Sequence, residues 1–123
     1  MARILIVEDN PDNMLLSVML LESVGHQVIS AVDAEAGLAV ARAERPDLIL
    51  MDIQLPGMDG LEATMLLKAD PLTRAVPVIA LTALAMKGDE ERIRAAGCDG
   101  YIAKPISIQD FLGSVAAQMA RTM

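Results

Sequence analysis

The sequence predicts an α/β fold, a doubly wound parallel sheet of five strands with helices on both faces. Short, uninterrupted apolar runs recur at residues 4–7, 28–29, 48–51, 78–81 and 101–103. Such runs are typical of strands that are buried on both faces. Stretches of roughly 10 to 15 residues with helical spacing separate them, which is the pattern of crossover helices between parallel strands. We therefore expect a chain of strand-then-helix units.

Length and composition limit the possible classes of protein. The 123 residues are expected to form one domain, residues 1–123, which is large enough to bury a continuous core without disulfides. Apolar residues make up 54% of the chain and aromatic residues only 2%, which suits close packing of helices on a sheet. The lone Cys98 is expected to be a buried thiol.

Charge and hydropathy exclude two classes of partner. The net charge is -7 without a basic cluster, so direct binding of nucleic acid is not expected. No apolar run approaches the roughly 20 residues of a membrane span, and the N-terminus enters a strand-like segment rather than a signal peptide. We therefore expect a cytoplasmic protein that does not contact membranes.

Capping residues place the first two helices. Asn10 followed by Pro11 is a good N-cap with proline in the first turn, and this helix is expected to end near Gly25. Asp33 is expected to cap the second helix, which ends before Pro46.

The second half of the chain continues the pattern. Pro71 and Pro77 bracket a loop between the third helix and the fourth strand, and acidic residues after Gly88 predict the first turn of the fourth helix. Ser107 and Asp110 have the spacing of a capping box at the start of the last helix. The apolar stripe of this helix consists of Ile108, Phe111, Leu112, Val115 and Met119.

Three acidic residues follow two strands that are expected to be neighbours. Glu8 and Asp9 come directly after the first strand, and Asp52 closes the third. In an open parallel sheet these residues meet at the carboxyl edge, where such folds bind ligands. Gathered carboxylates repel one another and require a cation, and a set of oxygen ligands without His or Cys suits Mg²⁺.

Two further strand ends provide groups that suit a phosphoryl group. Thr82 follows the fourth strand with a hydroxyl, and Lys104 follows the fifth with an ammonium. Together with a metal ion they would neutralise and orient a phosphoryl group on Asp52, since an aspartate carboxylate is a known nucleophile that forms acyl phosphates. Each residue alone is weak evidence, but four strand ends that each supply a different function favour a phosphorylation site.

The whole chain resembles the response-regulator receiver domain, which has the CheY-like, flavodoxin-like (βα)5 fold with strand order 2-1-3-4-5. The motifs that carry the resemblance are residues 7–10 (VEDN), 50–60 (LMDIQLPGMDG), 81–83 (LTA) and 101–105 (YIAKP). The tract Met86 to Arg94 and the ending Lys104-Pro105-Ile106-Ser107 are similar to single-domain DivK-type regulators.

The resemblance implies roles for individual residues. Asp52 would be the phosphoacceptor, Lys104 would contact the phosphoryl group, and Mg²⁺ would be held by Glu8, Asp9, Asp52 and the backbone carbonyl of Gln54.

The resemblance also implies a conformational switch. Thr82 and Tyr101 would form the switch pair that responds to phosphorylation. The peptide bond before Pro105 would be cis.

By the same resemblance, the protein would be a two-component response regulator rather than an enzyme, and it would catalyse only its own phosphorylation and dephosphorylation. A histidine kinase or a histidine phosphotransfer protein would supply the phosphoryl group. The protein, a monomer or weak dimer, would then change its contacts with a downstream target or relay the phosphoryl group. The alternative is a receiver domain of a hybrid histidine kinase or another multidomain regulator.

The first predicted helix is more apolar than its core face requires. One side must pack on the sheet, and we expect the surplus, next to Asp9, to be a docking surface for a kinase or phosphotransfer helix bundle. The apolar residues of this helix are Met14, Leu15, Leu16, Val18, Met19, Leu20, Leu21 and Val24.

Three other functions fit the sequence less well. A dehalogenase-type phosphatase requires a second acid two residues after the nucleophile, where this chain has Gln54. A nucleotide or flavin binder requires a glycine-rich loop after the first strand, where Glu8 and Asp9 would repel phosphate. A receiver-like module without phosphorylation would not require the full set of acids, hydroxyl and amine.

Overall fold

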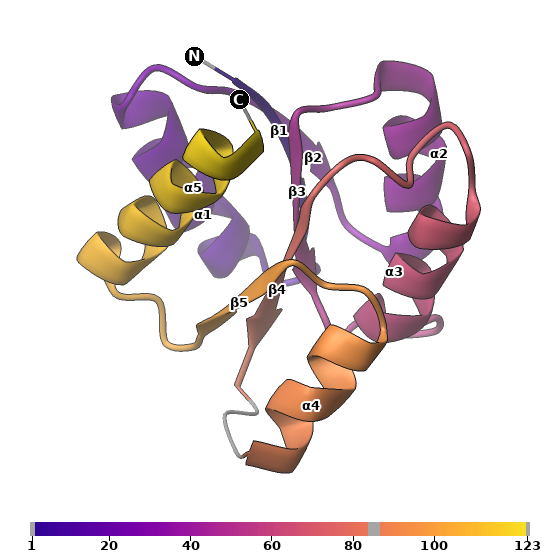
Figure 1. Ribbon diagram of the computed structural model, residues 1–123. Coiled ribbons are helices and arrows are strands. Elements are labelled where there is room, and N and C mark those ends of the chain that lie inside the picture. Colours follow the sequence, from indigo (N-terminus) through magenta and orange to yellow (C-terminus); the bar gives the residue numbers. More distant parts are fainter. Residues whose placement is uncertain (1, 84–86, 123) are drawn as a thin grey trace.

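The computed structural model describes residues 2–83 and 87–122, in which strands and helices alternate (Figure 1). The elements are β1 (Arg3–Val7), α1 (Pro11–Ser23), β2 (Gln27–Ala31), α2 (Ala34–Glu44), β3 (Leu48–Asp52), α3 (Gly60–Ala69), β4 (Val78–Thr82), α4 (Lys87–Ala95), β5 (Gly100–Ala103) and α5 (Ile108–Thr122). Met86, the first residue of the tract with DivK-type similarity, lies outside the described residues.

All five strands form one parallel sheet in the order β2-β1-β3-β4-β5. This confirms the fold class and the strand order expected from the sequence. The order reverses between β1 and β3, which are adjacent although α1, β2 and α2 separate them along the chain. In their register Val7 lies opposite Met51, so the residues that follow β1 lie beside the end of β3.

Helices cover both faces of the sheet, as Figure 1 shows. On one face Ile4, Leu50 and Leu81 pack with α1 and α5, including Leu21 and Phe111. On the other face alternate strand residues pack against α2, α3 and α4, and these residues are Leu5, Val7, Ile49, Met51, Val78 and Ala80. The two cores explain the uninterrupted apolar runs in the sequence, because both faces of each central strand are buried.

The first two helices start at the caps that the sequence predicts. The Asn10 side chain accepts hydrogen bonds from the backbone N–H groups of Asp12 and Asn13, and Asp33 accepts one from Ala36. These bonds satisfy N–H groups that have no partner inside the helix. In α5 the predicted apolar stripe is present except at Ile108, whose position in the first turn leaves 56% of it exposed.

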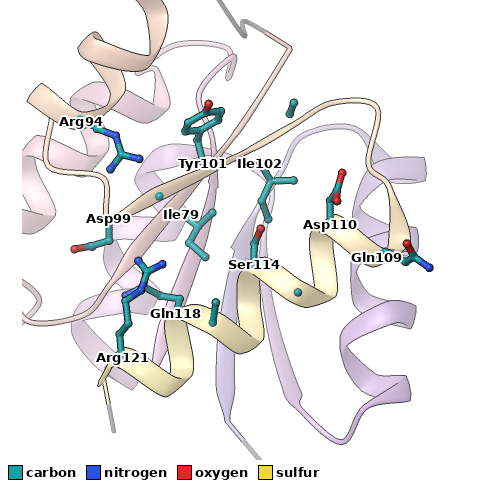
Figure 2. A pocket seen from close by; sticks show the side chains of 14 residues that line it. Ile79, Arg94, Asp99, Tyr101, Ile102, Gln109, Asp110, Ser114, Gln118 and Arg121 are labelled. Atoms are coloured by element: carbon teal, nitrogen blue, oxygen red, sulfur yellow. The ribbon is translucent and has the colours of Figure 1, made fainter. Parts of the chain in front are cut away.

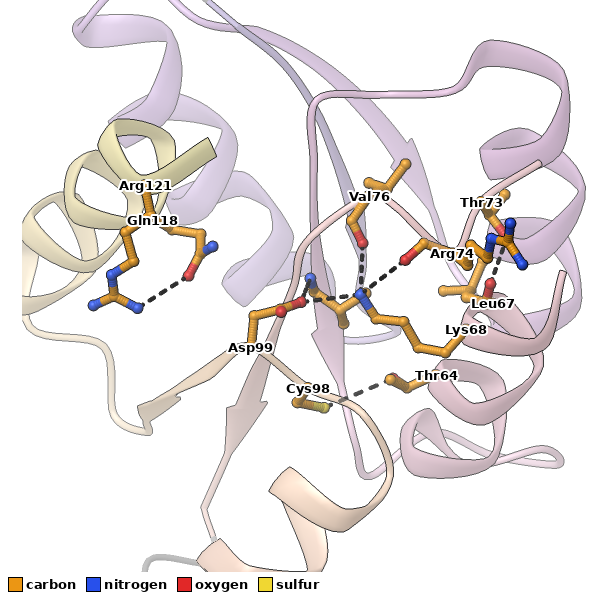
Figure 3. Close-up of polar contacts among 11 residues, drawn as sticks. Thr64, Leu67, Lys68, Thr73, Arg74, Val76, Cys98, Asp99, Gln118 and Arg121 are labelled. Atoms are coloured by element: carbon orange, nitrogen blue, oxygen red, sulfur yellow. Dashed lines mark hydrogen bonds and ion pairs between the residues drawn. The ribbon is translucent and has the colours of Figure 1, made fainter. Parts of the chain in front are cut away.

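At the edge of the sheet opposite the acidic residues, Lys68 joins three segments (Figure 3). Its Nζ donates to the Val76 carbonyl at 2.9 Å and to Asp99 Oδ2 at 3.0 Å, and the same Asp99 oxygen accepts from the Val78 N–H at 2.8 Å. The start of β5 is therefore tied to both α3 and β4.

Cys98 is buried, as expected from the sequence, with its thiol 3.8 Å from the Thr64 hydroxyl (Figure 3). No helix in the described part of the chain combines the length and the apolar character needed to cross a membrane.

Arg45 ends α2 in the left-handed backbone region, with φ of 44°, where a side chain is unfavourable. We expect Arg45→Gly to raise the free energy of unfolding by about 0.5–1 kcal/mol, because glycine adopts this conformation without strain. Urea unfolding followed by circular dichroism measures the change.

The matched control is Ala43→Gly, an exposed position inside the same helix. There glycine should lower the free energy of unfolding by about 0.5–1 kcal/mol. Equal effects of the two substitutions would contradict the assignment of strain to Arg45.

Candidate functional site

Three carboxylates meet at the carboxyl edge of the sheet. Glu8 and Asp9 follow β1 directly, and Asp52 is the last residue of β3. A ligand atom from each of the three lies within 4.8 Å of the others. Glu8 and Asp52 are almost fully buried, with exposures of 1% and 2%, whereas Asp9 is exposed. The predicted convergence of these acids is confirmed, and Asp9 marks the side of the site that is open to solvent.

Lys104 supplies the positive charge in this cluster. It follows β5, and its Nζ donates to Asp52 Oδ2 at 2.9 Å and to Glu8 Oε1 at 3.0 Å. One ammonium does not balance three carboxylates, so the cluster is two negative charges in excess when every acid is ionised. An excess of this size, surrounded by oxygen ligands, favours the binding of a divalent cation.

The backbone holds the remaining oxygen atoms of the two buried acids. The Gln54 N–H donates to Asp52 Oδ1 at 2.9 Å, and the Asn10 N–H lies 3.3 Å from Glu8 Oε2. The Lys104–Pro105 peptide bond is cis, as the resemblance implies. Each carboxylate is thus oriented by contacts on both of its oxygens, which leaves the pair little freedom to turn.

Gly60 is a residue of this site that the sequence interpretation did not single out. It opens α3, and a Cβ placed on it would lie 2.2 Å from the Asp52 carbonyl oxygen. The Asp59 side chain caps the helix through the Glu62 N–H, and the Gly60 N–H donates to the Ile53 carbonyl at 3.2 Å. Only a glycine allows the helix to begin so close to the backbone of Asp52. In the sequence, this contact is indicated by the helix-capping residue Asp59, which is followed directly by a glycine.

Thr82 and Tyr101 lie on the two strands next to this cluster. Thr82 ends β4 and is fully buried, and its carbonyl accepts a hydrogen bond from the Lys104 N–H at 2.7 Å. Tyr101 is partly buried and packs against the core on the α4 side of the sheet. The structure therefore puts Thr82 at the same edge as the acids and Tyr101 one strand further out.

The acids and the lysine perturb one another strongly. Burial, together with the neighbouring Asp52 carboxylate, raises the pKa of Glu8 from 4.5 to about 7. Burial acts to raise the pKa of Asp52 too, but hydrogen bonds to Glu8, the Gln54 N–H and Lys104 outweigh it and lower that pKa. The pKa of Lys104 is raised, because the two carboxylates outweigh the effect of burial. Without a metal ion and below about pH 7, the buried pair therefore holds a proton on Glu8 and a negative charge on Asp52.

The raised pKa of Glu8 predicts a dependence of stability on pH when no divalent cation is present. Between its usual pKa of 4.5 and about 7, folded Glu8 keeps a proton that the unfolded chain releases, so stability falls as the pH rises. The whole loss is about 3 kcal/mol at about 1.4 kcal/mol per pH unit. Glu8→Gln should remove it. Urea unfolding in a chelator at about pH 5 and about pH 7.5 measures the difference.

The control for this prediction is Glu22→Gln, which changes an exposed acid on α1. Burial also lowers the pKa of His26, but His26 is present in all three proteins and its contribution cancels. A Glu8→Gln variant that keeps the pH dependence of the unchanged protein would contradict the assignment.

Comparison with known proteins agrees with this geometry. Residues 4–116 match the response regulator receiver domain. The chain is 52% identical to the polar-differentiation response regulator DivK of Brucella anthropi, over 94% of both chains. A response regulator structure from Chloroflexus aurantiacus superposes with a TM-score of 0.93 at 29% identity, over 98% of both chains.

A further similar structure contains a magnesium ion. It is the receiver domain of a sensor histidine kinase from Pseudomonas aeruginosa, with a magnesium ion coordinated in its active site cleft. It superposes with a TM-score of 0.84 at 38% identity, over 98% of this chain and 95% of that one. By sequence and by structure, the chain belongs to the response regulator receiver domain family and serves in two-component signal transduction.

Proposed function

We propose that Asp52 accepts a phosphoryl group in a Mg²⁺-dependent reaction, and that this modification switches protein contacts or passes the group on. The observation that carries the proposal is the contact of Lys104 Nζ with Asp52 Oδ2 at 2.9 Å, inside a cluster of three carboxylates. This arrangement combines a nucleophile, a fixed positive charge and a set of metal ligands. The DivK relatives, 94% of whose length the chain spans, favour such a switch over a receiver domain within a kinase.

The residues present fit a magnesium ion. Glu8, Asp9 and Asp52 offer carboxylate oxygens, and the Gln54 carbonyl would add a neutral one. Burial and the neighbouring Asp52 carboxylate raise the pKa of Glu8, and a divalent cation beside both carboxylates would favour their ionised forms. When bound, Mg²⁺ would neutralise charge on the transferring phosphoryl group and orient it. The exposed side chain of Asp9 leaves this side of the site open to water ligands and phosphate oxygens.

The transfer step needs no other nucleophile. Asp52 Oδ2 attacks the phosphorus of a phosphohistidine, the new O–P bond forms as the N–P bond breaks, and the electron pair of the broken bond returns to the imidazole. The Gln54 N–H keeps Oδ1 in place, so that Oδ2 is the oxygen beside Lys104. The ammonium then interacts with the phosphoryl oxygens, where charge develops. Hydrolysis of the acyl phosphate by water restores the carboxylate.

Two alternatives fit the site less well. A phosphatase with an aspartate nucleophile would place a second acid at position 54, and the side chain there is the exposed amide of Gln54. A nucleotide-binding site would present backbone N–H groups after β1, where the acids Glu8 and Asp9 stand. The protein is accordingly a phosphoacceptor that is modified once rather than an enzyme that turns over a substrate.

Thr82 and Tyr101 provide a route from the site to the surface. Thr82 is fully buried beside Lys104, and Tyr101 lies partly exposed between α4 and α5 (Figure 2). A phosphoryl group on Asp52 would recruit the Thr82 hydroxyl and vacate space that Tyr101 enters, which shifts the population between two arrangements of this face. Such a shift changes what a partner protein meets at α4 and β5.

Incubation with acetyl phosphate and Mg²⁺ tests the phosphoacceptor. Intact mass should rise by one phosphoryl group in the unchanged protein, and not in Asp52→Asn or in the presence of a chelator. Lys104→Ala should slow the reaction roughly a hundredfold, because it removes the charge that stabilises the transferring group. Asp12→Asn, an exposed acid on α1, is the control and should react normally. Modification of Asp52→Asn at the normal rate would refute the proposal.

The first helix offers a surface for the protein that donates the phosphoryl group. As expected, some apolar residues of α1 belong to the core and others lie on the surface. Leu21 is fully buried, whereas Leu15, Leu16 and Met19 are 60%, 37% and 58% exposed. These three residues lie within little more than one turn of α1, the helix that begins two residues after Asp9. We propose that the α1 surface of Leu15, Leu16 and Met19 docks against an apolar helix face of a histidine phosphotransfer protein or kinase.

Leu15→Ser and Met19→Ser should each slow transfer from a phosphorylated histidine phosphotransfer domain about tenfold or more, since an apolar contact at the centre of such an interface is worth about 1–2 kcal/mol. Reaction with acetyl phosphate should not change. Met65→Ser, at a methionine on α3 that is 53% exposed, is the matched control. The docking surface is wrong if both phosphodonors are slowed equally, or if Met65→Ser has the same effect.

A further inference from the structure

Two side chains, one on each side, hold the backbone at the start of β1. The Arg3 N–H donates at 2.8 Å to Oδ2 of Asp47, which lies just before β3. The Ala2 N–H donates at 3.1 Å to Nδ1 of His26, which lies just before β2. Backbone N–H groups alternate in direction along a strand, so these two successive residues need acceptors on opposite sides. Here both acceptors are side chains rather than carbonyl groups of a neighbouring strand.

The His26 ring replaces a backbone partner in the pairing of β1 with β2. The Ala2 carbonyl accepts from the Gln27 N–H at 2.8 Å, which continues the parallel register in which Arg3 lies opposite Gln27. The Ala2 N–H uses the imidazole where a further residue of β2 would offer a carbonyl. Ala2 is 4% exposed and belongs to the same core cluster as Ile4. The bond therefore fixes a buried residue at the end of the sheet.

An imidazole accepts a hydrogen bond at Nδ1 only while that nitrogen carries no proton. The neutral ring has one donor and one acceptor, whereas the protonated ring has two donors. Protonation of His26 would thus place an N–H group against the Ala2 N–H, and the hydrogen bond would be lost. Asp47 behaves differently, because a carboxyl group keeps an acceptor oxygen even when it is protonated. The two contacts at the start of β1 therefore differ in their response to acid.

The surroundings of His26 favour the neutral ring. Burial lowers the pKa of His26 below its usual value of 6.5, and the positive charge of the amino terminus acts in the same direction. Among the nearby charged side chains, Arg3 on β1 directs its guanidinium to Glu44, and Glu22 in the last turn of α1 is exposed. The contact is therefore present at neutral pH and is lost as the pH falls through this lowered pKa. This dependence is opposite in sign to that of Glu8.

We propose that His26 is an acid-sensitive contact that releases the start of β1 from β2 when its ring is protonated. Nδ1 takes a proton from the solvent, and the Ala2 N–H loses its acceptor. Ala2 then leaves its buried position and uncovers the apolar end of the core. The pairing of β1 with β3 remains, because Asp47 still accepts from the Arg3 N–H. The contact lies at the edge of the sheet opposite the acidic cluster, so its release does not depend on phosphorylation.

NMR of the isotope-labelled protein tests this contact. The ring protons of His26 report its protonation, and the Ala2 amide proton should shift upfield with the same midpoint. Amide exchange at Ala2, corrected for the intrinsic effect of pH, should become about tenfold less protected between about pH 7.5 and about pH 5. The Arg3 amide, held by Asp47, is the internal control and should keep its protection. An Ala2 amide that does not follow the titration of His26 would overturn the proposal.

Two substitutions separate the hydrogen bond from the protonation. His26→Asn places an amide oxygen close to the position of Nδ1, where it is an acceptor that does not titrate, so Ala2 should stay protected at both pH values. His26→Gln carries its amide one atom further out, near the other ring nitrogen, so protection of Ala2 should be low at both. A His26→Gln variant that keeps the protection would contradict the proposal. Equal loss of protection at Leu50, in the central strand β3, would show general unfolding instead of local release and would also contradict it.

Discussion

The interaction on which this molecule depends is the attraction between one ammonium and two buried carboxylates at the carboxyl edge of the sheet. Lys104 reaches Asp52 and Glu8 across strands that lie 52 and 96 residues away in the sequence. Burial makes every charge there costly, so the cluster persists only because each acid is also held by a backbone N–H. The buried acids are thus oriented by several hydrogen bonds but lack positive charge, which suits the binding of a cation and then of a phosphoryl group.

The fold brings these residues together because the strand order reverses between β1 and β3. Parallel strands bring their carboxyl ends to one edge, and the register of Val7 with Met51 puts the residues after β1 beside Asp52. α3 then begins in contact with the Asp52 backbone, a closeness that Gly60 alone permits. The geometry of the site therefore depends on the strand order and on the glycine at position 60 as much as on the charged residues.

Much of this was predictable from the sequence, for physical reasons that differ from residue to residue. Asn10 and Asp33 act within a few residues along the chain, so their capping roles follow from local spacing. Glu8, Asp52 and Lys104 are distant in sequence, and their convergence followed only from the rule that parallel strands end together. Gly60 and the Lys68 contacts depend on how particular helices pack on the sheet. The cap before Gly60 marks a helix start but does not show that this start lies against the Asp52 backbone, and no local pattern encodes the Lys68 contacts.

Different contacts hold the two ends of β5. At its start, the strand is fastened to α3 and β4 by an ion pair and a backbone hydrogen bond that lie far from Asp52. At its finish, the next residue is Lys104, whose position depends on the charge of the acids it contacts. A change of charge on these acids would therefore act on the end of β5 more directly than on its start, and Tyr101 lies between the two.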